Sequence, residues 1–99
     1  MDIRFSKDGN TLVVYLEGEI DHHTSMMIRE RIDSRFLMEP VKNIVLDFSK
    51  VTFMDSAGIG LIMGRQSKAA SVGGNLRIIN PKPEIRKILK LSKLEHMIG

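Results

Sequence analysis

The chain has 99 residues, of which 42% are hydrophobic and 27% charged, and it contains no cysteine. This size and balance are typical of one small globular domain, and they argue against disorder, disulfides and thiolate metal ligands. No apolar run approaches the roughly 20 residues that a membrane-spanning helix needs, so we expect a cytoplasmic protein. The net charge is +3, but the basic residues are spread over helical patterns without an aromatic stacking platform, which does not favour direct nucleic-acid binding.

The first half of the chain predicts a β-hairpin followed by a helix. Residues 3–17 have the composition of two strands, joined by the turn residues Asp8–Asn10. From His22 to about Met38 the apolar residues recur with a helical period. Asp21 or Thr24 can cap this helix by accepting hydrogen bonds from its first free amides.

The second half alternates strands with helices. The nearly continuous apolar segment 43–48 predicts a central strand, and 75–80 predicts a short one. Helical patterns run from Ser56 to about Val72, where Gly73-Gly74 stops the helix, and from Glu84 to about Lys90. The buried stripe of the longer helix is expected at Ile59, Ile62, Met63, Ala69 and Ala70.

The order β-β-α-β-α-β-α determines the expected fold class. Strands that are joined through helices lie parallel in one sheet, whereas the opening hairpin is antiparallel. The alternation in the first hairpin strand indicates an edge strand with one exposed side. We therefore predict a single α/β domain, with about four strands in a mixed sheet and helices packed mainly on one face.

Ser56 lies between an apolar segment and a glycine-rich helix start, which makes it a candidate catalytic residue. A hydrolase nucleophile elbow requires Gly-x-Ser-x-Gly, but Met54 replaces the first glycine and no histidine stands in the context of a general base. The spacing Gly58-x-Gly60-x-x-x-Gly64 is a weak dinucleotide fingerprint, because it does not follow a strand directly and lacks the accompanying acidic residue. We expect neither catalysis nor a cofactor.

His22 and His23 follow Asp21 and could in principle ligate a metal ion. Adjacent residues at a helix start point about 100° apart, and the spacing suggests no third or fourth ligand. A polar helix start that is capped by Asp21 explains the same residues. We therefore predict no metal site.

The simplest role for Ser56 is that of the helix N-cap. Gly60, Gly64 and Leu61 are expected on the face opposite the buried stripe. Each helix-interior glycine costs about 1 kcal/mol relative to alanine, which a face exposed only to solvent would not require. We therefore expect a partner to approach this face closely.

Three segments resemble bacterial anti-sigma factor antagonists of the STAS domain family, in particular those of the sporulation sigma-F pathway. The first is Gly18-Glu19-Ile20-Asp21-His22-His23-Thr24 and the second is the strand Ile44-Val45-Leu46-Asp47. The third is Phe53-Met54-Asp55-Ser56-Ala57-Gly58-Ile59-Gly60, followed by Gly64-Arg65. The resemblance continues in register from the first hairpin to about Leu94.

This resemblance implies a regulatory domain that binds an anti-sigma factor, which is also a serine kinase, and thereby releases the sigma factor. In the family the kinase phosphorylates the serine after Met-Asp, which here is Ser56. The phosphorylated protein no longer binds the anti-sigma factor, and a PP2C-type phosphatase restores binding. Ala57 stands where the family often has a second serine, so Ser56 is the only acceptor in the motif. The expected partner-binding surface consists of Asp21, His22, His23, Asp55, Ser56, Gly60, Leu61 and Gly64.

Some alternatives stay open at this point. A STAS module that senses a small ligand or a nucleotide would share the same motifs, and sporulation and stress-response pathways cannot be told apart. Family members usually continue through a last strand and a C-terminal helix, whereas this sequence stops at Gly99. We therefore expect one STAS domain over residues 1–99 with that part shortened or absent, as a monomer or weak dimer.

Overall fold

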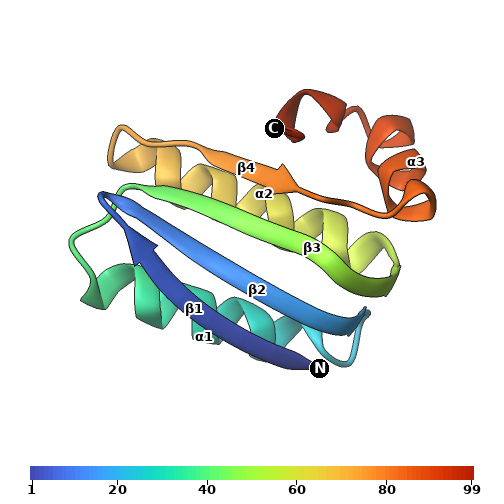
Figure 1. Ribbon diagram of the computed structural model, residues 1–99, viewed down its shortest axis with the longest axis horizontal. Helices are drawn as coiled ribbons and strands as arrows, with labels where there is room; N and C mark the ends of the chain where they lie inside the picture. Colours follow the sequence, from blue (N-terminus) through green and yellow to red (C-terminus); the bar gives the residue numbers. More distant parts are fainter.

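Three parallel strands and one antiparallel edge strand form the sheet, as the computed structural model of all 99 residues shows (Figure 1). The strand order is β1-β2-β3-β4. The strands are β1 (Asp2–Asp8), β2 (Thr11–Ile20), β3 (Asn43–Met54) and β4 (Leu76–Ile79). The helices are α1 (Ser25–Met38), α2 (Ser56–Ser71) and α3 (Pro83–Leu91), followed by a 3₁₀ turn at Glu95–Met97. The predicted fold class and element order are confirmed.

Helices α1 and α2 pack on one face of the sheet and run behind the strands in Figure 1, whereas α3 lies beyond the carboxyl end of β4. The largest fully buried side chains come from both layers, and they include Leu46 and Phe48 on β3, Ile28 and Ile32 on α1 and Ile62 on α2. Burying an aliphatic or aromatic side chain of this kind contributes roughly 1.5–3 kcal/mol. This core fixes α1 and α2 against the sheet.

The loops after β2 and after β3 lie side by side. The two strands are parallel, so their carboxyl ends meet at the same end of the sheet, where Ile20 lies opposite Met54. The amide of Asp55 donates a hydrogen bond to the carbonyl of Ile20 at 3.2 Å. The start of α1 is thereby brought next to the start of α2.

Two predicted boundaries near this end were wrong. The first helix begins at Ser25 and not at His22, because the Asp21 carboxylate holds the following amides in a turn. The strand predicted to end at Phe48 continues to Met54, since Val51 and Met54 still point into the core and the pairing with β2 persists. The segment before Ser56 is therefore part of the strand, although its register against β2 shifts between Gly18 and Glu19.

The predicted orientation of α2 was also partly wrong. Its buried residues are Gly58, Leu61, Ile62, Arg65 and Ala69, whereas the side chains expected to be buried at Met63 and Ala70 are exposed. Arg65 is buried next to Asp33 on α1, which neutralises its charge, and Leu61, one turn earlier on α2, is buried as well. The helix ends where predicted, with Gly73 at φ 81°.

Candidate functional site

A hydrogen-bonded turn after β2 forms one side of the site. One carboxylate oxygen of Asp21 accepts the amides of His23 and Thr24, both at 2.9 Å. The Asp21 amide donates to the Thr24 hydroxyl oxygen at 3.0 Å, and that hydroxyl donates to the carbonyl of Glu19 at 2.9 Å. The hydrogen bond from the Thr24 amide is the main cause that lowers the pKa of Asp21 below its usual value. The carboxylate is thus used to hold the turn in place.

Asp55 caps α2, and the prediction that Ser56 is the cap was wrong. The Asp55 backbone is extended and its carboxylate accepts the amide of Ala57 at 2.8 Å. Ser56 therefore occupies the first helical position, and its side chain is exposed. Because a neighbour supplies the cap, the Ser56 hydroxyl forms no hydrogen bond within the chain and is free to react or to contact a partner.

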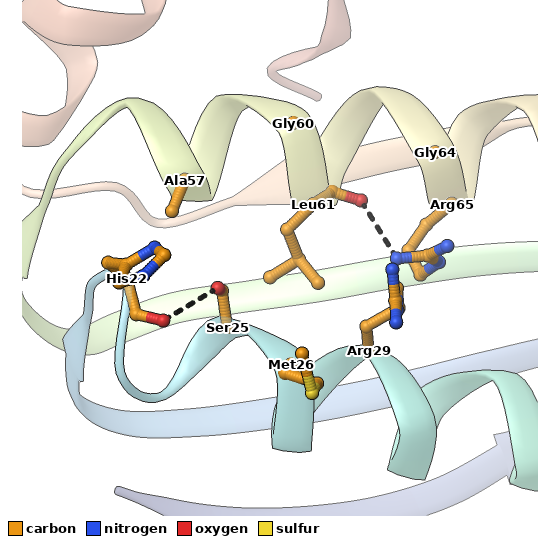
Figure 2. A pocket seen from close by; sticks show the side chains of 9 residues that line it. All are labelled: His22, Ser25, Met26, Arg29, Ala57, Gly60, Leu61, Gly64 and Arg65. Atoms are coloured by element: carbon orange, nitrogen blue, oxygen red, sulfur yellow. Dashed lines mark hydrogen bonds between the residues drawn. The ribbon is translucent and has the colours of Figure 1, made fainter.

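A hollow lies between the first halves of α1 and α2, as Figure 2 shows. We call it the proximal hollow. Its volume is about 360 Å³. Leu61 and Arg65 extend from α2 toward α1, whereas Gly60 and Gly64 present only backbone. Ser56 directly precedes the lining residue Ala57. The lining residues are His22, Ser25, Met26, Arg29, Ala57, Gly60, Leu61, Gly64 and Arg65.

The three glycines of α2 differ in what surrounds them. A Cβ atom on Gly58 would overlap Cγ of the buried Met54 and lie 3.3 Å from Cγ2 of Ile20, so packing within the domain disfavours a side chain there. A Cβ atom on Gly60 or Gly64 would meet nothing within 4 Å. The fold of the isolated domain therefore requires Gly58 but does not require Gly60 or Gly64.

Arg65 and Asp33 connect the two helices at the inner end of the proximal hollow. Arg65 is only 5% exposed, and its Nε lies 2.8 Å from Oδ1 of Asp33. Neither atom has a well-aligned hydrogen bond, so the contact is an ion pair and not a directed bond. Burial lowers the pKa of Arg65, while the charge of Asp33 opposes that shift. No local pattern in the sequence indicates this pair, because the two residues lie on different helices.

The structure brings most of the predicted partner-binding surface together at one end of α1 and α2. His22, Gly60 and Gly64 line the proximal hollow, and Ser56 lies beside it. Leu61 is the exception, because it is 4% exposed and forms part of the floor. The exposed large apolar side chain on this helix is Met63, at 55%. Sequence reasoning missed Met63 because it assigned that residue to the buried stripe.

His22 and His23 are consecutive residues of the turn before α1. Their rings meet edge to face with centroids 5.9 Å apart. No group of three His, Cys, Asp or Glu side chains is placed to hold a metal ion. None of the helices has the length and apolar character needed to cross a membrane.

The fold agrees with comparisons to known proteins. The STAS domain family model matches residues 2–99, and the chain belongs to this family. Within the family it is similar to the anti-sigma F factor antagonist of Lysinibacillus sphaericus, with 37% identity over 84 residues, 85% of this chain and 72% of that relative.

Two solved structures are similar over nearly the whole chain. The anti-sigma factor antagonist SpoIIAA in its unphosphorylated form superposes with a TM-score of 0.88 and 32% identity, covering 99% of this chain and 86% of that one. The Bacillus cell fate determinant SpoIIAA in its phosphorylated form gives a TM-score of 0.78 and 32% identity, covering 99% and 89%. The similarity thus includes a protein that has been observed with and without phosphate.

Proposed function

We propose that this chain is an anti-sigma factor antagonist, which binds an anti-sigma factor that is also a serine kinase and so releases the sigma factor. Phosphorylation of Ser56 switches it off, and a PP2C-type phosphatase restores it. The observation that carries the proposal is the free, exposed hydroxyl of Ser56 beside a helix surface with glycines that the fold does not need. The similarity to SpoIIAA in two phosphorylation states supports the same assignment.

The docking surface follows from the backbone exposed on α2. Gly60 and Gly64 are one helical turn apart, and the space beside each is empty. A partner can therefore approach the backbone of α2 more closely than any side chain would allow. Asp21, His22 and His23 stand on the neighbouring turn, and Asp55 and Ser56 at the helix start, so the partner contacts both loops at once.

The modification acts on binding and not on folding. The kinase transfers the γ-phosphoryl group of ATP to Ser56 Oγ, the hydroxyl proton is lost, and ADP leaves. The phosphate adds about −1.5 to −2 charges, and the first turn of a helix is where free amides and the helix dipole stabilise an anion. With Asp55 beside it, the phosphate makes the start of α2 strongly negative. This weakens partner binding by at least a few kcal/mol, which raises Kd roughly a hundredfold.

Phosphorylation by the anti-sigma factor kinase of the same genome tests this proposal. Incubation with that kinase and ATP should add one phosphate to the wild-type protein, as measured by intact mass, and none to Ser56→Ala. A phosphate that remains on Ser56→Ala would place the acceptor elsewhere.

Binding of the same kinase gives the second test. Immobilised kinase should retain the wild type and Ser56→Ala but not Ser56→Asp. Ser56→Asn is the matched control, because it has the shape of aspartate without the charge. Retention of Ser56→Asp at the wild-type level would refute the switch.

A further inference from the structure

A second hollow lies between α1 and α2 at the end far from Ser56, and we call it the distal hollow. Its volume is about 480 Å³. Two of its apolar side chains extend into solvent, Leu37 with 86% exposure and Val72 with 53%. Phe36 is partly buried and packs against the core behind them. The lining residues are Asp33, Ser34, Phe36, Leu37, Lys68, Ser71 and Val72.

The proximal and distal hollows follow one another along the same two helices, and we call the two together the furrow. The Asp33–Arg65 ion pair separates them, with Arg65 lining the proximal hollow and Asp33 the distal one. From Ala57 to Val72 the axis of α2 rises by about 22 Å. A furrow of this length between two helices is the shape that receives a third helix, which places its apolar residues into the hollows.

The charges along the furrow are mainly positive. Asp33 and Arg65 neutralise each other, and Asp33 is the only acidic side chain that lines either hollow. Arg29 lines the proximal hollow and Lys68 lines the distal hollow. Both side chains are exposed, and neither forms a salt bridge. The nearby Glu30 lines a different hollow, together with Phe5. A complementary ligand is therefore apolar on one side and carries negative charges at its edges.

We propose that the furrow receives one acidic amphipathic helix of the protein partner. Its apolar residues fill the distal hollow around Leu37 and Val72, it passes over the bare backbone at Gly60 and Gly64, and its acidic residues pair with Arg29 and Lys68. This inference rests on the proposed function, since the partner is the anti-sigma factor kinase. It also gives the physical reason for the switch, because phosphate on Ser56 repels an acidic helix at the proximal end of the furrow.

Calorimetric titration of the purified kinase against variants of the distal hollow tests this proposal. The double variant Leu37→Ser/Val72→Ser and the charge reversal Lys68→Glu should each weaken binding at least tenfold. Leu91→Ser and Lys90→Glu are matched controls, because both residues are exposed on α3 and outside the furrow. They should bind with the wild-type Kd. Raising the salt concentration should weaken the wild type more than Lys68→Glu, since exposed charges are screened.

The outcomes separate this inference from the proposed function. If the kinase binds the wild type and the distal variants equally well, the furrow proposal is refuted while the proposed function stands. If the kinase does not bind the wild type, both are refuted. Two further results would overturn the assignment to a partner helix. One is a dimer of this chain that the Leu37→Ser/Val72→Ser variant loses in sedimentation, and the other is binding to vesicles of anionic lipid that depends on the same residues.

Discussion

Replacing Gly60 and Gly64 with alanine should strengthen folding and weaken partner binding. A Cβ atom at either position would meet nothing within 4 Å in the free domain. Alanine is favoured over glycine in a helix interior by about 0.5–1 kcal/mol, because it restricts the unfolded chain more. The double variant should therefore gain roughly 1–2 kcal/mol in free energy of unfolding, the sum of the two single effects.

The assay is thermal or urea unfolding of the free protein, followed by titration with the kinase. In a domain of this size 1 kcal/mol corresponds to about 4–8 °C in Tm, so the gain is readily measured. The same two methyl groups occupy space that the partner needs, and we expect at least a tenfold weaker Kd, which is about 1.4 kcal/mol.

Gly58→Ala is the matched control for this experiment. Its Cβ atom would overlap the buried side chain of Met54, and overpacking of a core costs roughly 1–3 kcal/mol. This variant should be less stable than the wild type, although its helix propensity also rises. The reasoning would be refuted if the Gly60→Ala/Gly64→Ala variant bound the kinase as tightly as the wild type, or if it were destabilised as Gly58→Ala is.

Three further predictions concern the residues that hold the site in place. Asp55→Ala removes the cap of α2 and should cost about 1 kcal/mol in urea unfolding, whereas Asp55→Asn should cost much less. Asp33→Ala leaves the charge of Arg65 buried without an opposite charge, and it should lower the free energy of unfolding by an amount near the lower end of the roughly 3–5 kcal/mol seen for such pairs, because Asp33 is partly exposed. The double variant Asp33→Leu/Arg65→Leu should recover most of that stability. A double variant as unstable as Asp33→Ala would contradict this. Because the pKa of Asp21 is lowered, its ionised form stabilises the fold above the ordinary aspartate pKa, and this stabilisation is lost as the pH falls through the lowered pKa. Asp21→Asn should therefore lose less stability than the wild type when the pH falls below about 4. Identical acid unfolding curves for the two proteins would contradict this.

The fold was predictable from the sequence because its elements have clear periods and clear ends. The apolar run at 43–48 belongs to a central strand, as predicted, and Gly73 stops α2 with a positive φ. Both signals are local, so they depend little on how the elements later pack.

The orientation of α2 was harder to predict, because it depends on contacts with α1 that include the Asp33–Arg65 ion pair. Hydrophobicity alone assigns Met63 to the core and Arg65 to the surface, and the structure has the reverse. Only the position of Asp33 on α1 makes burial of Arg65 tolerable. The furrow depends on the same packing and could not be predicted from either helix alone.

The cap of α2 was assigned one residue too late for a different reason. Asp55 and Ser56 are adjacent, and both types are good caps. The sequence does not distinguish them, whereas the extended backbone of Asp55 and its hydrogen bond to Ala57 do. The correction strengthens the proposed role of Ser56, because a capping serine would have its hydroxyl engaged by the helix.

The affinity of the kinase for the Ser56-phosphorylated protein tests the central claim most directly. The phosphorylated and unmodified forms are prepared from the same batch, their folding is compared by thermal unfolding, and each is titrated with the kinase. We predict similar unfolding transitions and a Kd that is at least roughly a hundredfold weaker for the phosphorylated form. Equal affinities of two equally folded forms would contradict the account.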